Sequence, residues 1–386
     1  FIRLYNNDGK GNFKLNKVAF PQNVSIISSA VAVADYDADG DIDIFIGGRI
    51  TPGKYPQSPL SYILQNSNGI FSDVTKQVCP DLQNAGMITA ALSTDFNSDK
   101  KPDLIICGEW MPIRFFRNDN GILTEVTATT GLTANNGMWR SLQAVDIDND
   151  GDMDYIAGNM GLNNKYHTTP EMPMMLYEKD MDKNGSADLI IAYYIKNNEG
   201  KYELFPGPDR NQLSDQIPSI KKKYLLHKEY ADVNMEKLTG DYGNDGWTKL
   251  TCETMHTVWI ENTGNARLPG GQGKFKLHLL PLAAQLAPVN AILPYDINDD
   301  GNMDLIIAGN EYEEDAMTGR YDASYGLVLE ADGKGNFHPL NIVKSGFIVD
   351  GDVKDMKPVN IKNRGKLIVA AVNNDKVKCF ALTKEK

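Results

Sequence analysis

The stretch VAVADYDADGDIDIFIGG, residues 31–48, decides the fold, because altered copies of it recur four more times along the chain. The other copies are ALSTDFNSDKKPDLIICG (91–108), LQAVDIDNDGDMDYIAGN (142–159), LYEKDMDKNGSADLIIAY (176–193) and ILPYDINDDGNMDLIIAG (292–309). Each copy is an apolar run, an acidic loop of the pattern DxDxDGxxD or a near variant, and a second apolar run. Five copies in one chain of 386 residues indicate a repeat architecture.

The spacing of the acidic residues is typical of a loop that surrounds a hard cation. Calcium takes about 6 to 8 oxygen ligands, which a turning loop can supply from side chains at positions 1, 3, 5 and 9 and a backbone carbonyl at position 7. A glycine at position 6, such as Gly40, allows the tight turn. The predicted ligand positions are Asp35, Asp37, Asp39, Asp41, Asp43; Asp95, Asn97, Asp99, Lys101, Asp103; Asp146, Asp148, Asp150, Asp152, Asp154; Asp180, Asp182, Asn184, Ser186, Asp188; and Asp296, Asn298, Asp300, Asn302, Asp304. We therefore expect four to five bound Ca²⁺ ions, the second loop departing most from the pattern because Lys100 replaces the glycine.

The residue at position 12 distinguishes these loops from EF-hands. An EF-hand needs a bidentate Glu there, at the start of a helix. Here position 12 is apolar in every copy: Ile46, Ile106, Ala157, Ile191 and Ile307. The flanking runs, such as DLIICG, have the β-branched composition of strands. The loops are therefore predicted to be the turns of β-hairpins.

Composition excludes several classes of function. The net charge of −12 argues against nucleic acid as a partner, and five divalent ions would bring it to about −2. No apolar run approaches the roughly 18 residues of a membrane span. The four cysteines are far apart and form no CxxC pair, so neither a zinc site nor a redox motif is expected, and buried free thiols are favoured over disulfides.

A second repeated element predicts how many strands each unit has. Strings such as NSNGIF (66–71) and RNDNGIL (117–123) are hairpin turns, so each unit should have four strands. Units of about 48 residues then give an all-β propeller of seven blades, with six or eight as alternatives, over one domain at 1–386. A helical or irregular insertion is predicted at 195–257, and the opening strand FIRLY (1–5) is expected to complete the C-terminal blade.

These loops resemble the FG-GAP/VCBS repeat family, which includes the integrin α-subunit propeller and many bacterial surface proteins. Finer stretches are similar to bacterial proteins related to cartilage acidic protein, often found with an ASPIC/UnbV domain. These stretches are GGRITPGKYP (47–56), GEWMP (108–112), GNMGLNNKY (158–166) and TGRYDASYG (318–326). The resemblance implies a propeller with calcium in its hairpin loops, and an extracytoplasmic location: at the cell surface, associated with the outer membrane, or secreted. It implies no reaction.

A ligand face is predicted at the ends of the hairpins opposite the acidic loops. Its candidate residues are Arg49, Tyr55, Glu109, Trp110, Asn163, Tyr166, Arg320 and Tyr321. Such side chains can hold a protein or glycan by stacking and hydrogen bonding. The alternative is that they pack against and pair with each other.

Function is expected to be binding rather than catalysis. The chain has no GxSxG, HExxH or Walker-type GK[ST] motif. The favoured hypothesis is a surface module for a protein or glycan, tethered or part of an envelope complex and not itself membrane-spanning. The alternatives are a pure scaffold, or a calcium-dependent carbohydrate-active enzyme such as a polysaccharide lyase, which would need a base such as Lys165 or His167.

Overall fold

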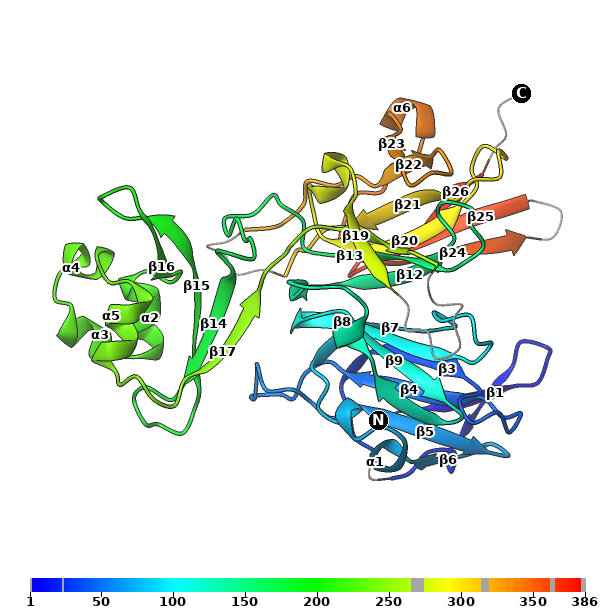
Figure 1. Ribbon diagram of the computed structural model, residues 1–386, viewed down its shortest axis with the longest axis horizontal. Coiled ribbons are helices and arrows are strands. Elements are labelled where there is room, and N and C mark those ends of the chain that lie inside the picture. Colours follow the sequence, from blue (N-terminus) through cyan, green and yellow to red (C-terminus); the bar gives the residue numbers. More distant parts are fainter. Residues whose placement is uncertain (1, 23, 265–273, 314–318, 362–364, 383–386) are drawn as a thin grey trace. The chain divides into compact units, whose positions relative to one another are not determined.

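The computed structural model describes residues 2–22, 24–264, 274–313, 319–361 and 365–382 (Figure 1). The chain divides into two compact units. Unit 1 comprises residues 1–133, 138–163 and 256–386, and unit 2 comprises 134–137 and 164–255. The sequence predicted one domain over 1–386 with an insertion at 195–257. Unit 2 is larger than that insertion, because it also contains residues 164–194.

Unit 1 is built from five successive antiparallel sheets. The first contains β3 (Ser28–Ala34), β4 (Asp43–Gly48), β5 (Tyr62–Ser67) and β6 (Ile70–Asp73), and the second β7 (Met87–Thr94), β8 (Asp103–Met111), β9 (Arg114–Asp119) and β10 (Ile122–Glu125). The third contains β12 (Ser141–Val145), β13 (Asp154–Gly158), β18 (Val258–Asn262) and β19 (Phe275–Leu279). The fourth contains β20 (Val289–Tyr295), β21 (Asp304–Gly309), β22 (Leu327–Ala331) and β23 (Phe337–Pro339), and the fifth β24 (Val353–Ile361), β25 (Gly365–Val372) and β26 (Lys378–Ala381). Short helices between them are α1 (Thr75–Val78) and α6 (Ile342–Ser345), and β11 (Gly137–Met138) adds a short fifth strand to the second sheet.

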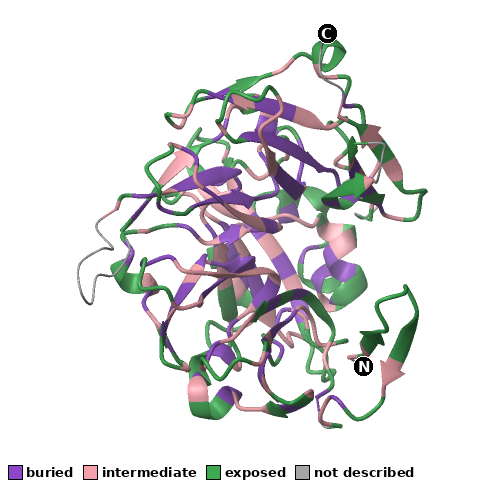
Figure 2. Cartoon of the chain, turned by 90° about the vertical axis from the view of Figure 1, so that its right-hand side faces the viewer, coloured by how far each residue is buried: buried purple, intermediate pink, exposed green. Residues whose placement is uncertain are grey.

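Apolar layers between neighbouring sheets form the core of unit 1. Ala30 and Phe45 of the first sheet pack with Ile88 of the second, and the same kind of layer lies between each later pair of sheets. A sheet covered on both faces needs apolar residues at successive positions rather than alternate ones. All nine residues of β8 are accordingly buried. Figure 2 shows buried residues in purple along the strands.

A polar side chain at one equivalent position also links each sheet of unit 1 to the next. Ser29 Oγ donates to the carbonyl of Ile88 at 3.1 Å, and Thr89 Oγ1 donates to that of Trp139 at 2.8 Å. In the later sheets the links run from Ser141 Oγ to Val289 O at 2.7 Å and from Asn290 Nδ2 to Val353 O at 3.1 Å. Three of the four donors sit at β-bulges, which re-aim a side chain out of its own ladder. We call these four hydrogen bonds the bulge ladder.

Unit 2 combines one sheet with four helices. Its strands are β14 (Met174–Lys179), β15 (Asp188–Lys196), β16 (Tyr202–Pro206) and β17 (Thr248–Cys252). Its helices are α2 (Arg210–Gln216), α3 (Ser219–Lys223), α4 (His227–Ala231) and α5 (Met235–Asp241). Asp209 caps α2 by accepting the backbone N–H groups of Asn211 and Gln212. The predicted insertion covers these helices, but the fourth acidic loop joins β14 to β15 and therefore belongs to unit 2.

The fold is thus all-β and propeller-like, with small helices, as predicted. The described residues form seven sheets, but not seven equal blades, because one sheet belongs to unit 2 and one is only the hairpin of β1 (Leu4–Asn7) and β2 (Phe13–Asn16). The expectation that FIRLY completes the C-terminal blade is wrong, since Leu4 and Tyr5 pair with β2. Thr318, which begins one of the stretches quoted for the family resemblance, lies outside the described residues. Among the described helices, none is long and apolar enough to cross a membrane.

Candidate functional site

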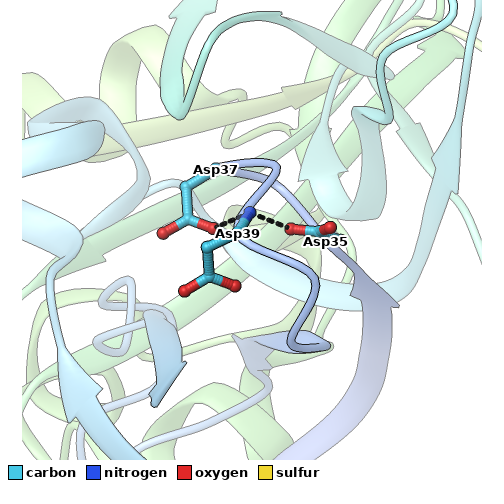
Figure 3. A group of neighbouring side chains, drawn as sticks. All are labelled: Asp35, Asp37 and Asp39. Carbon is cyan, nitrogen blue, oxygen red and sulfur yellow. Dashed lines mark hydrogen bonds between the residues drawn. The ribbon is translucent and has the colours of Figure 1, made fainter.

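The five acidic loops share one backbone geometry. In the first loop, the Asp35 carboxylate accepts the N–H of Asp39 at 3.1 Å (Figure 3) and that of Gly40 at 3.0 Å. The bond from position 6 to position 1 recurs in all five loops, at 2.7–3.1 Å. The residue at position 4 is left-handed throughout, with φ of 58–62°. The carboxylate at position 1 therefore holds the loop in its turn through hydrogen bonds to backbone N–H groups, without the help of an ion.

The second loop adopts the same geometry despite its divergent sequence. Lys100 replaces the glycine at position 6 and takes φ 68°, a conformation that costs a non-glycine residue about 1 kcal/mol. Its N–H still donates to Asp95 at 2.7 Å, and the N–H of Lys101 donates to Asp99 at 2.9 Å. The loop is therefore formed, with its position-7 residue placed as in the other copies.

The buried aspartate at position 9 is hydrogen-bonded to two hairpins and so joins them. Asp43 Oδ2 accepts the N–H of Tyr36 in its own loop at 3.0 Å, while Oδ1 accepts the N–H of Asn66 in the outer hairpin at 2.8 Å. Equivalent pairs of bonds are made by Asp103, Asp154 and Asp304. Burial, together with the neighbouring carboxylates, raises the pKa of Asp103 and of Asp154 to about 7.

Carboxylates converge in three of the loops. Among the described residues, ligand atoms lie within 4.8 Å of one another in the groups Asp35, Asp37, Asp39; Asp146, Asp148, Asp154; and Asp180, Asp182, Asp188. In the second and fifth loops position 3 is an asparagine, and the amide oxygens of Asn97 and Asn298 accept the N–H of position 5 at 3.0 Å. Position 7 donates to the side chain of position 5 in every loop, at 2.8–3.0 Å.

Two atoms of the third loop test whether this donor set fits a cation. Asp146 Oδ1 and Asp148 Oδ1 are buried and have no hydrogen-bond partner. A buried carboxylate oxygen without a partner costs several kcal/mol, and a bound cation would remove that cost. The residues of this loop therefore fit a metal ion, and all the ligands they offer are oxygens.

Asparagines of the outer hairpins join the acidic loops of neighbouring sheets, and the sequence analysis missed them. Asn118 Nδ2 donates to the carbonyl of Tyr36 in the preceding loop at 2.8 Å and to that of Pro102 at 3.0 Å. Asn262 Nδ2 donates to Phe96 O at 3.1 Å in the same way. Both asparagines are at most 2% exposed. For Asn118 the signal was present in the N-x-N-G turn at 118–121, which was interpreted only as a turn, whereas Asn262 lies in no such motif.

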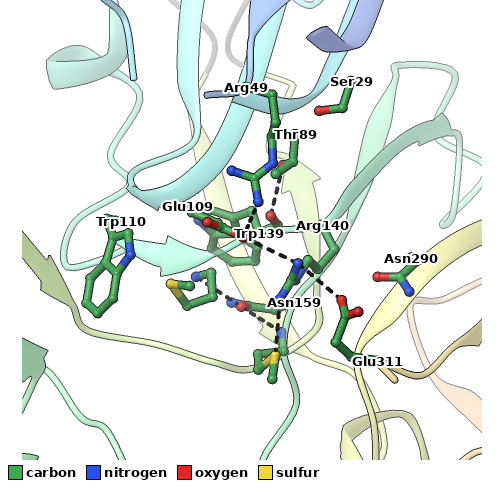
Figure 4. A network of polar contacts seen from close by, with 12 residues as sticks. Ser29, Arg49, Thr89, Glu109, Trp110, Trp139, Arg140, Asn159, Asn290 and Glu311 are labelled. Carbon is green, nitrogen blue, oxygen red and sulfur yellow. Dashed lines mark hydrogen bonds and ion pairs between the residues drawn. The ribbon is translucent and has the colours of Figure 1, made fainter. Parts of the chain in front are cut away.

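At the opposite ends of the hairpins, charged side chains form a continuous chain from the first to the fifth sheet of unit 1, and Figure 4 shows its members from Arg49 to Glu311. Arg49 Nη2 lies 2.5 Å from Glu109 Oε1, and Arg140 Nη1 lies 3.3 Å from the same oxygen. Glu311 then pairs with Arg140 at 3.6 Å and with Lys354 at 3.5 Å. We call this the ion-pair chain. Arg140, Glu311 and Lys354 lie in no motif, and only the fold brings them together.

Four of the eight predicted ligand-face residues contact one another in pairs. Besides the Arg49–Glu109 ion pair, Trp110 Nε1 donates to the Tyr55 hydroxyl at 2.6 Å. Tyr321 exchanges two backbone hydrogen bonds of 2.9 Å with Glu311. These contacts favour a packing role for the residues concerned.

The remaining candidates are spread over both units. The Arg320 guanidinium lies 4.6 Å above the ring of Tyr312. Asn163 belongs to unit 1 and Tyr166 to unit 2, where the ring of Tyr166 packs edge-on against Tyr193 at 5.3 Å. Lys165, considered as a base, has its ammonium 5.5 Å from the Tyr166 ring. Ligand binding by any of these residues stays a prediction.

Comparisons with known proteins give one family match and distant structural similarity. Two solved structures resemble the chain weakly. The first, the V. cholerae biofilm matrix protein Bap1, has a TM-score of 0.32 at 11% identity, over 94% of this chain and 68% of that one. The second, BBS1N in complex with ARL6DN, has a TM-score of 0.26 at 10% identity, over 94% of each chain. No curated protein matches the sequence. The model of the FG-GAP-like repeat matches residues 2–46 and 95–157, so the chain carries FG-GAP-like repeats and these matches support the FG-GAP family.

Proposed function

We propose that this chain is an extracytoplasmic, calcium-binding β-propeller module that binds a protein or glycan ligand at the cell surface. The observation that carries the calcium assignment is the third loop. There, the buried and unpaired Oδ1 atoms of Asp146 and Asp148 belong to a group that converges with Asp154 within 4.8 Å. Such an arrangement is costly without a cation and stable with one.

Calcium fits this donor set better than other common ions. Carboxylate, amide and carbonyl oxygens suit a hard cation, whereas zinc and copper favour imidazole and thiolate groups, which the five loops lack. The residues that would hold the ions are those at positions 1, 3, 5, 7 and 9 of each loop. When bound, the ion neutralises the crowded carboxylates and fixes the turn of the hairpin.

The ligand is assigned to the hairpin ends that carry the ion-pair chain. The exposed Arg320 guanidinium over Tyr312 offers a charged group and an aromatic face at this end. Resemblance to bacterial surface proteins related to cartilage acidic protein supports an extracytoplasmic setting. We propose no catalytic role, and no motif or geometry favours the lyase alternative.

Metal counting combined with thermal unfolding tests the calcium assignment. The purified chain should carry four or five calcium ions, and a chelator should lower its melting temperature, since a ligand that binds only the folded state stabilises it. Asp148→Asn should remove one ion, whereas Asp81→Asn, at an exposed aspartate outside the loops, should remove none. A chain without bound ions, with a melting temperature that does not respond to chelator, would refute the assignment.

Binding to immobilised polysaccharides and cell-surface proteins tests the ligand assignment. Arg320→Ala should weaken binding, while Arg117→Ala, at the acidic-loop end of the second sheet, should leave it unchanged. If both variants bind like the wild type, the ligand face lies elsewhere. Formation of an unsaturated sugar product, followed by ultraviolet absorbance, would instead support the lyase.

A further inference from the structure

The fifth sheet of unit 1 has three strands, whereas each of the other four sheets has a further outer strand. β26 lies at its edge, and no strand among the described residues pairs with the other side of β26. The N–H of Leu382, directly after β26, donates to the carbonyl of Lys366 in β25 at 3.2 Å. Because backbone groups alternate in direction along an antiparallel strand, the N–H and C=O groups of Cys379 and Ala381 point away from β25. The edge can therefore bond to an added strand.

A groove of about 730 Å³ lies along this edge, between the fourth and fifth sheets. We call it the edge groove. Its lining is largely apolar and comes from both sides: Ile297, Ile306, Val328 and Leu340 from the fourth sheet and its loops, and Ile368, Phe380 and Leu382 from the fifth. Its volume lies within the range of ligand-binding pockets.

In the four complete sheets of unit 1, the outer strand buries one large apolar side chain in the layer that precedes its sheet. These side chains are Phe71 of β6, Leu123 of β10, Phe275 of β19 and Phe337 of β23. All four are at most 7% exposed. They lie opposite equivalent residues of the third strand: Asn66, Asn118, Asn262 and Ala331.

The pairing register gives this equivalent position to Leu382 in the fifth sheet. Ile368 pairs with Phe380 just as Leu305 pairs with Leu329 in the fourth sheet, when each pair is counted from the β-bulge of its own sheet. The residue two positions further along the third strand is the one that faces the buried side chain. In the fifth sheet that residue is Leu382, and it lines the edge groove.

The opposite wall of the groove has the same correspondence. Ile147 and Ile156, at positions 2 and 11 of the third repeat, lie in one apolar cluster with Phe337. Ile297 and Ile306 hold positions 2 and 11 of the fifth repeat and line the edge groove. Both walls thus match the surroundings of a large apolar side chain on an outer strand. The four complete sheets show which kind of segment covers such a site.

We propose that a partner protein adds an extended strand to β26 and inserts a Phe or Leu side chain into the edge groove, opposite Leu382. The strand runs antiparallel to β26 and bonds to the outward backbone groups of Cys379 and Ala381. The hydrogen bonds supply affinity, and the groove selects large apolar side chains at alternate positions. This surface is separate from the ligand face proposed above, which lies at the hairpin ends that carry the ion-pair chain.

The outer strand of the third sheet supplies a probe, because its apolar residues Phe275 and Leu277 are separated by a polar one. A labelled peptide with the sequence of residues 274–280, KFKLHLL, should bind the full chain saturably in fluorescence anisotropy with saturating calcium. A control peptide, KSKSHLL, keeps the charge but lacks the two apolar side chains, and it should not bind. The comparison separates the groove from general attraction of a basic peptide to a chain of net charge −12.

Variants of the edge test the geometry. Ala381→Pro removes an outward N–H at an edge position and should weaken binding about tenfold. Leu382→Ser removes apolar contact with the inserted side chain and should also weaken binding about tenfold. Val377→Ser is the matched control, because Val377 directly precedes β26, is 60% exposed and does not line the groove, and it should bind like the wild type. Urea denaturation of each variant verifies that it is folded.

Several outcomes would overturn the proposal. Failure of the wild type to bind KFKLHLL would do so, as would equal binding of KSKSHLL or wild-type affinity in both Ala381→Pro and Leu382→Ser. An equal loss in Val377→Ser would show that the groove is not the site. Sedimentation of the chain alone should show a monomer. Self-association that Ala381→Pro abolishes would instead show that a second copy of the chain, and not a partner protein, supplies the strand.

Discussion

Asn118 should contribute more to stability than any other outer-hairpin turn residue of its sheet, because it joins two acidic loops. Its side chain is 1% exposed and makes three hydrogen bonds: to Tyr36 O, to Pro102 O and from the N–H of Gly121 at 2.8 Å. Each such bond contributes about 1 kcal/mol net, and the groups left behind are buried. We therefore expect Asn118→Ala to lower the free energy of unfolding by about 3 kcal/mol.

Asn66 provides the matched comparison in the first sheet. It has the same place in its turn, donates to Ile42 O at 3.1 Å and accepts the N–H of Gly69 at 2.8 Å, but it makes no bond to a preceding sheet. It is also only half-buried, so Asn66→Ala should cost about 1 kcal/mol. Of the difference between the variants, about 2 kcal/mol, about half comes from the bond to Tyr36 that links the sheets and the rest from the deeper burial of Asn118.

Urea denaturation of both variants with saturating calcium gives the two values. Tryptophan fluorescence reports mainly on unit 1, which holds Trp110, Trp139 and Trp259, whereas Trp247 belongs to unit 2. Equal destabilisation by the two substitutions would refute the reasoning, since it would show that the bond to Tyr36 adds nothing. A changed denaturant slope would instead indicate that the sheets no longer unfold together.

Two further predictions concern the ion-pair chain and the cysteines. Glu109→Gln should destabilise unit 1 by about 2 kcal/mol in the same urea assay. Glu109 is only 8% exposed, and without its charge Arg49 and Arg140 would lose their shared counter-charge. An unchanged urea midpoint of unfolding would contradict this prediction. A thiol reagent should modify only Cys379 in the native chain and all four cysteines in denaturant, because Cys79, Cys107 and Cys252 are buried. Burial also raises the pKa of Cys79 to about 11 and that of Cys107 to about 12, which lowers the reactivity of both thiols. Rapid modification of a second thiol in the native chain would contradict it.

The sequence was sufficient for the acidic loops because their geometry is local. An aspartate at position 1 can reach the N–H groups of positions 5 and 6 in any chain that has this spacing, so even Lys100 follows the pattern. The hairpins around the loops were predictable for the same reason. Strand composition and turn residues act within about 20 residues and need no information about distant parts of the chain.

The arrangement of the repeats depended on distant pairings and was predicted less well. Nothing in residues 176–193 shows that their hairpin lies in a different compact unit from the other four. The opening strand was assigned to the C-terminal blade, but the nearby β2 is reached by a much shorter loop and pairs with it instead. The ion-pair chain was beyond prediction because its members come from five separate sheets.

The position of unit 2 in the chain has a consequence for how this protein could be rearranged. The segment leaves the third sheet after β13 and returns at β18, and these are neighbouring strands in which Ala157 pairs with Val258. The two ends of the excursion are thus held a strand spacing apart by hydrogen bonds of unit 1 alone. A short turn could replace 164–255 and keep the register of the third sheet, provided that Asn136, which bonds to Thr251 and Glu253, is given new partners. The hairpin end after β13 is therefore a natural acceptor site for exchange of whole modules.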